Sequence, residues 1–107
     1  MKASVSTKPG DKKVLILVVA YNVEKTIGSV LTRIPVAALP RQTEILVVDD
    51  SSADGTYQAA VAQGPSVRGL NLTVLVNPVS QGYGGNQKIG YQYAIEKGFD
   101  VVALLHG

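Results

Sequence analysis

Two adjacent carboxylates, Asp49 and Asp50, directly follow the apolar run 45–48, and small polar residues come next at 51–56. Neighbouring carboxylates repel each other, so they persist where water, a cation or a hydrogen-bond donor accepts them. An apolar run that ends in two acids therefore indicates a polar site at the end of a buried strand.

Three other apolar runs also end in polar or flexible residues. The pair Tyr21-Asn22 follows residues 14–20, the glycine-rich segment 77–86 follows residues 71–76, and His106 follows residues 100–105. The runs 14–20 and 44–48 show no polar alternation, which is typical of strands covered on both faces in a parallel sheet.

Apolar residues at helical spacing lie between these runs. They predict a first helix that ends before Pro35, a second with Asp54 as its N-cap, and a third that follows a loop at 77–86 and closes at Gly98. Alternation of strands and helices produces a parallel sheet with right-handed crossovers. The predicted fold class is α/β, a mostly parallel, Rossmann-like sheet with helices on both faces. In such sheets ligands bind beyond the carboxyl ends of the strands, where the polar segments would meet.

The composition of the 107 residues suits one small domain. The apolar fraction is 46%, and the net charge of +2 comes from the first thirteen residues, so a nucleic-acid surface is not expected. The chain has no cysteine, which excludes disulfides and thiolate metal sites. No apolar run is long enough to span a membrane. Residues 1–12 are predicted to be a disordered leader, and residues 13–107 the folded part.

Two nucleotide signatures are absent from the chain. AYNVEK stands after the first run where a dinucleotide site needs G-x-G-x-x-G, and Tyr91-Gln92 follow Gly90 where a phosphate loop needs Lys and Ser or Thr. Three other segments occur instead: VVAYN, VVDDSSADGT and N-x4-G-Y-G-G-N-Q-K, after the first, second and third runs.

In this order the three segments resemble the family 2 glycosyltransferases, which have the GT-A fold, and in particular the group of dolichol-phosphate mannose synthase and its bacterial relatives. The resemblance covers residues 13–107 as the N-terminal portion of such a domain. It implies transfer of a sugar from a UDP- or GDP-sugar to a lipid phosphate or a saccharide, in cell-wall or polysaccharide biosynthesis. The implied location is the cytoplasm or the cytoplasmic face of a membrane.

The resemblance also implies a nucleotide site. Tyr21 would lie against the base, and an aromatic face offers about 1–3 kcal/mol per stacked base. Asp50 would accept the ring N–H of uracil or guanine, a donor that cytosine lacks, while Asp49 would bond backbone N–H groups of the turn. Lys88, one turn into the third helix, would reach the diphosphate or lie on the surface. The implied nucleotide-binding residues are Ala20, Tyr21, Asn22, Glu24, Asp49, Asp50, Gly84, Gly85 and Lys88.

The chain departs from the family pattern in two places. Val23 stands where the family's Y-N-E motif has its glutamate, and Glu24 comes next. LLHG stands where an acidic D-x-D motif holds Mg²⁺ or Mn²⁺ on the diphosphate, so His106 is the candidate metal ligand. The resemblance places the catalytic base and the acceptor site beyond Gly107. This chain is therefore expected to bind nucleotide without catalysing transfer.

Other interpretations stay open from the residues themselves. Tyr21 would also suit a core position at a strand end, the two acids a solvated turn, and the glycines a flexible connection. A sugar nucleotidyltransferase shares the sheet but usually has a glycine-rich loop after the first strand. A flavodoxin-like signalling domain would need an acid after the third strand, where Asn77 and Pro78 stand.

Overall fold

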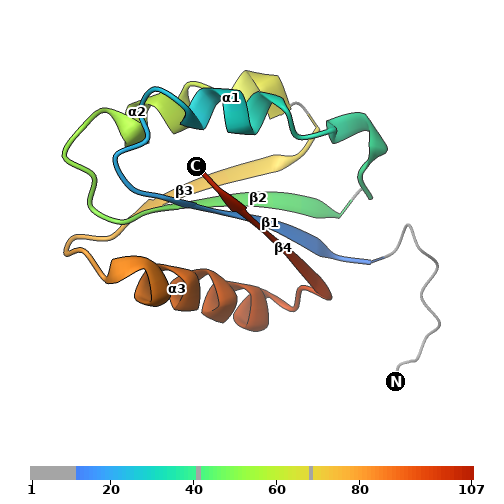
Figure 1. Cartoon of the computed structure of the whole chain (residues 1–107). Helices are drawn as coiled ribbons and strands as arrows, with labels where there is room; N and C mark the ends of the chain where they lie inside the picture. Colours follow the sequence, from blue (N-terminus) through green and yellow to red (C-terminus); the bar gives the residue numbers. More distant parts are fainter. Residues whose placement is uncertain (1–11, 41, 68) are drawn as a thin grey trace.

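The structure is a computed structural model that describes residues 12–40, 42–67 and 69–107, and within them four strands form one parallel sheet (Figure 1). The strands are β1 (Val14–Ala20), β2 (Thr43–Asp49), β3 (Asn71–Val76) and β4 (Val101–His106). They lie in the order β3-β2-β1-β4, and each neighbouring pair is parallel. The predicted parallel sheet is confirmed.

Helices cover both faces of the sheet, as predicted. Figure 1 shows α1 (Ile27–Thr32) and α2 (Thr56–Val61) on one face and α3 (Gly82–Lys97) on the other. Two 3₁₀ segments, η2 (Val36–Ala38) and η3 (Gly64–Val67), pack on the side of α1. None of the helices in the described ranges has both the length and the hydrophobicity that a membrane span requires. The predicted leader falls, except for its last residue, outside the described residues.

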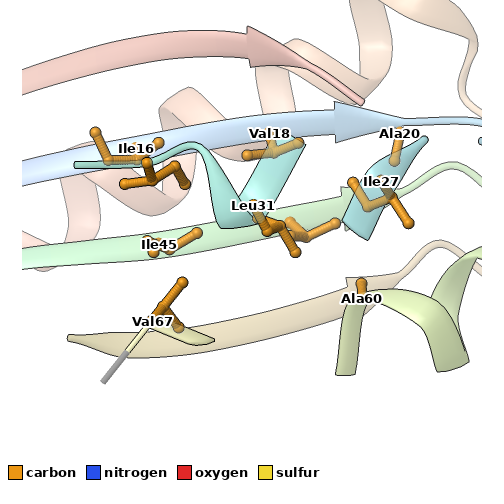
Figure 2. Close-up of a cluster of buried hydrophobic side chains, with 10 residues drawn as sticks. Ile16, Val18, Ala20, Ile27, Leu31, Ile45, Ala60 and Val67 are labelled. Atoms are coloured by element: carbon orange, nitrogen blue, oxygen red, sulfur yellow. The ribbon is translucent and has the colours of Figure 1, made fainter. Parts of the chain in front are cut away.

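One layer of the core lies between the sheet and α1. In β1, the side chains of Ile16, Val18 and Ala20 point to this face and meet Ile27 and Leu31 (Figure 2). All five are buried. Alternate side chains of a strand point to opposite faces, so a continuous apolar run supplies two core layers at once.

The second layer lies between the sheet and α3. Leu15, Leu17 and Val19 of β1 point to this face and contact the cluster that contains Ala94. Gly90 brings the two elements close together, because a Cβ atom at this position would lie 2.3 Å from Cδ1 of Leu17. A glycine is required for this close approach of α3 to β1.

Two strands extend into residues that the sequence pattern placed after them. Asp49 is the last residue of β2 and pairs with Ala20 of β1. His106 is the last residue of β4 and pairs with Val19. The apolar run underestimates each strand because backbone hydrogen bonding continues through a polar residue.

The predicted loop at 77–86 is wrong in its second half, because α3 begins at Gly82. Glycine has a low helix propensity, which favours a loop. Gly82 itself has a φ angle of +76°, which favours glycine at this first position. The carboxylate of Asp50 fixes the start of the helix, since it accepts hydrogen bonds from the backbone N–H groups of Gln81 and Gly82. A negative group at this end of a helix satisfies free donors and complements the helix dipole.

The boundaries of the two short helices also differ from the prediction. α1 ends at Thr32, before Ile34 and Pro35. Gly55, rather than Asp54, occupies the N-cap position of α2. The carboxylate of Asp54 nevertheless accepts a hydrogen bond from the N–H of Thr56 at 3.0 Å. The capping chemistry is therefore that of the aspartate, one residue ahead of the assigned cap.

Candidate functional site

The strand order creates a cleft at the carboxyl edge of the sheet. The chain runs outward from β1 to β2 and β3, then returns to place β4 on the other side of β1. Ligands of open α/β sheets bind at such a reversal of strand order. A cleft of about 490 Å³ lies at this point, and its lining includes Tyr21, Asp50, Ser80, Tyr83, Asn86 and His106.

Asp50 is the buried carboxylate of the cleft, and the protein itself supplies four donors to it. Its Oδ1 accepts hydrogen bonds from the N–H of Gln81 at 2.6 Å and from Nδ2 of Asn77 at 2.9 Å. Its Oδ2 accepts from Oγ of Ser80 at 2.9 Å and from the N–H of Gly82 at 3.0 Å. A carboxylate offers about four lone-pair sites, so all of them are filled.

These contacts also set the charge state of Asp50. Burial raises the pKa of the carboxyl, but the hydrogen bonds from Gln81, Asn77, Ser80 and Gly82 lower it by more, so the pKa lies below its ordinary value. The group is therefore ionised at neutral pH. Its charge is stabilised by N–H and O–H dipoles, with no cation in this set of partners.

Two asparagines extend the hydrogen bonds of Asp50 across the sheet. Asn77 follows β3 and donates from Nδ2 both to Asp50 and to Oδ1 of Asn86, the latter at 2.8 Å. Asn86, in α3, donates from Nδ2 to the carbonyl oxygen of Val48 at 2.9 Å. Both asparagines are buried. The network ties the ends of β2 and β3 to the first turns of α3, which fixes one wall of the cleft.

Asp49 shapes the turn between β2 and α2. Its Oδ1 accepts the N–H of Ser52 at 3.1 Å, which is the kind of backbone contact expected of it. Ser51 and Asn22 both have positive φ angles, 63° and 51°, which non-glycine residues adopt rarely. Oγ of Ser52 accepts the N–H of Asn22 at 2.8 Å, and Oδ1 of Asn22 accepts the N–H of Ala53 at 2.9 Å. The turns after β1 and β2 therefore hold each other.

Three ring side chains border the cleft. Tyr21, directly after β1, is 56% exposed, and Tyr83, in the first turn of α3, is 62% exposed. Tyr83 stacks on His106 with ring centroids 5.5 Å apart and ring planes 14° apart. Its hydroxyl lies 3.3 Å from Nε2 of His106. The cleft thus combines aromatic faces with one buried anion.

The structure brings part of the predicted site together. Ala20, Tyr21 and Asp50 line the cleft, as does His106. The remaining predicted nucleotide-binding residues lie outside its lining, and they are Asn22, Glu24, Asp49, Gly84, Gly85 and Lys88.

Glu24 and Lys88 face elsewhere. Oε1 of Glu24 accepts the N–H of Gly55 at 3.0 Å, so this side chain supports the start of α2. Lys88 is exposed in the second turn of α3. An exposed position is one of the two that the sequence left open for this lysine.

Sequence reasoning gave no role to Ser80, Tyr83, Asn77 or Asn86. All four lie within residues 77–86, the segment N-x4-G-Y-G-G-N, so the motif was recognised but no role was given to the individual residues. The residue type alone does not tell whether a polar residue near a loop is exposed or buried. Only the position of α3 shows that both asparagines are buried and paired.

The residues of the cleft do not by themselves fit a divalent cation. Among the described residues, no group of three or more His, Asp, Glu or Cys side chains lies close enough to hold a metal ion. Asp50 directs its lone pairs to four protein donors, and His106 is a single ligand beside a tyrosine hydroxyl. Mg²⁺ needs several oxygen ligands in near-octahedral geometry.

The fold and the cleft define an α/β protein with a ligand site at a switch point of strand order. Residues 15–106 match the family model for glycosyl transferase family 2, so the chain belongs to that family. The GT-A type of sheet expected from the sequence is thereby confirmed.

Two similar proteins narrow the comparison. The chain is 34% identical over 93 residues to an undecaprenyl-phosphate mannosyltransferase of Micrococcus luteus, covering 84% of this chain and 35% of that protein. The structure of this chain is similar to that of the mannosyltransferase PcManGT of Pyrobaculum calidifontis in complex with GDP-Man and Mn²⁺, with a TM-score of 0.70 and 26% identity. That match covers 88% of this chain and 28% of the other. The chain therefore spans about a third of the length of these relatives.

Proposed function

We propose that this chain forms the nucleotide-binding part of a mannosyltransferase that uses GDP-mannose as donor and a polyprenyl phosphate as acceptor. The observation that carries the proposal is the cleft at the switch point, which combines Tyr21 with the ionised Asp50. The two similar mannosyltransferases support the sugar, the base and the acceptor class.

The proposed binding mode follows from the two kinds of group in the cleft. The exposed ring of Tyr21 stacks on the base. Asp50 accepts the ring N–H of guanine, but only after one of its present donors leaves. The hydroxyl of Ser80 is the donor that leaves most easily, because it moves by side-chain rotation whereas Gln81 and Gly82 donate from the backbone of α3.

In the proposed reaction an oxygen of the lipid phosphate forms a bond to C1 of mannose. The bond from C1 to the β-phosphate oxygen breaks, and GDP leaves with the electron pair. A divalent cation, Mg²⁺ or Mn²⁺, would neutralise the charge on the leaving diphosphate. The described residues hold no cluster of three or more His, Asp, Glu or Cys side chains for this cation. The chain by itself is proposed to bind nucleotide without transferring the sugar, at the cytoplasmic face of a membrane.

Calorimetric titration of the chain with GDP, UDP and CDP tests the proposal. GDP should bind, and UDP should bind more weakly, since the similar structure from Pyrobaculum calidifontis is a complex with GDP-Man. CDP should bind weakest, because cytosine has no ring N–H for Asp50. Tyr21→Leu should weaken the binding of all three, and Tyr57→Leu, which changes an exposed tyrosine of α2, is the matched control. Failure of the unmodified chain to bind any nucleotide would refute the proposed function.

A further inference from the structure

Tyr83 is a second exposed tyrosine of the cleft, and neither the resemblance nor the relatives gives it a role. It is 62% exposed although it lies in the first turn of a helix that packs on the sheet. A tyrosine ring gains stability from burial. An exposed ring that borders a cleft is therefore available for a ligand.

The ring of Tyr83 is held in a defined orientation. One of its faces is stacked on His106, with 5.5 Å between ring centroids and 14° between ring planes. The hydroxyl is 3.3 Å from Nε2 of the same histidine. The high exposure means that the opposite face is open. A ring that is already oriented loses less conformational freedom when a planar ligand stacks on it.

The neighbours of Tyr83 in the chain leave that open face accessible. Gly82 and Gly84 flank it, and no atom lies within 4 Å of the position where a Cβ would stand at either residue. Gly82 has a φ angle of +76°, a backbone conformation that favours glycine. Neither neighbour therefore places a side chain beside the ring, and Tyr83 and Asp50 line the same cleft.

We infer that the open face of Tyr83 is a stacking surface for the base of the nucleotide, so that Tyr21 and Tyr83 both contact it. The inference rests on the proposed function and adds a binding residue to it. A base is favoured over the hexose because it is planar, as is the open face of the ring, and because Asp50 lies in the same cleft. The His106 ring supports this surface from behind.

Titration of GDP and of pyrophosphate into three variants tests the inference, with EDTA present to exclude metal effects. Tyr83→Leu removes the aromatic face, and Tyr83→Phe keeps it while removing the hydroxyl next to His106. Tyr91→Leu is the matched control, because Tyr91 is an exposed tyrosine of the same helix outside the cleft lining. The chain has no tryptophan, so quenching of tyrosine emission by GDP gives a second readout.

Tyr83→Leu should weaken GDP binding by about 5- to 150-fold, the range expected for one stacked base, and leave pyrophosphate binding unchanged. Tyr83→Phe and Tyr91→Leu should bind GDP like the unmodified chain. Unchanged GDP affinity in Tyr83→Leu, or an equal loss of pyrophosphate affinity, would overturn the inference while the proposed function stands. A loss seen with GDP-mannose but not with GDP would also overturn it, because the ring would then contact the sugar. An unmodified chain that binds no nucleotide would instead overturn both.

Discussion

Replacing Asp50 by asparagine turns one acceptor oxygen into an NH₂ donor with almost no change in size. At the Oδ1 position the new donor would face two others, the N–H of Gln81 and Nδ2 of Asn77. At the Oδ2 position it would face the N–H of Gly82 and the hydroxyl of Ser80, which can rotate and accept instead. The second orientation breaks fewer hydrogen bonds, and it leaves the partly buried N–H of Gly82 without a partner.

The expected loss of stability follows from the hydrogen bonds that this substitution breaks and weakens. An unsatisfied buried donor costs about 1–3 kcal/mol, and the partly buried N–H of Gly82 belongs at the lower end of that range. The bonds that remain become neutral, and a hydrogen bond to a charged group is stronger than a neutral one by about 1 kcal/mol. The free energy of unfolding should therefore fall by about 3 kcal/mol, a large part of the 5–15 kcal/mol typical of a domain.

Asp49→Asn is a matched control at the adjacent position. In the described residues only Oδ1 of Asp49 accepts hydrogen bonds, and both come from Ser52. The amide nitrogen can occupy the Oδ2 position and leave these bonds in place. The loss of stability should then be below about 1.5 kcal/mol, the value of one ordinary hydrogen bond.

Urea unfolding followed by far-UV circular dichroism compares the two variants with the unmodified chain. The expected result is a much lower midpoint for Asp50→Asn than for Asp49→Asn, with similar m-values. Equal destabilisation by the two substitutions would refute the reasoning. It would show that the second carboxylate oxygen of Asp50 and its charge add no stability to the hydrogen bonds from the four donors.

Three further predictions concern pH, packing and metal. The pKa of Asp50 is lower in the folded than in the unfolded chain. The stability that its ionised form contributes is therefore complete above about pH 4 and is lost as the pH falls through the pKa of the folded chain. In acid unfolding, the stability of Asp50→Asn should depend less steeply on pH than that of the unmodified chain. Gly90→Ala should lower stability by about 1–3 kcal/mol through overpacking against Leu17, whereas Gly84→Ala, which meets open space, should not, as measured by urea unfolding. GDP affinity should change little when Mn²⁺ is added to this chain, and a large gain that His106→Ala abolishes would contradict this.

The strands of this protein were predictable because their physical signal is local. Each strand buried on both faces needs an apolar run, and the order of runs and helical patterns defines the parallel sheet. The carboxyl-edge location of Tyr21, Asp50 and His106 followed from the same topology. These features depend on residues within a few positions of one another.

The start of α3 and the hydrogen-bond network of the cleft were not predictable because they depend on residues that are distant in the sequence. α3 begins at Gly82, where Asp50, which lies far away in the sequence, accepts the backbone N–H. The burial of Asn77 and Asn86 depends on how closely α3 approaches the sheet, and that distance is set by Gly90 against Leu17. Propensities report none of these contacts.

The strand order also has a consequence for the kinetics of folding. β4 pairs with β1 from the other end of the chain, with Val14 opposite Val101, whereas Val14 pairs with Thr43 on its other side. The loop closed by the first pairing is about three times longer, which adds about 1 kcal/mol of closure entropy. Non-local pairings of this kind slow folding, so β4 should join the sheet last. His106 then reaches Tyr83 only in the final step, and competence to bind a nucleotide should appear with the slowest refolding phase.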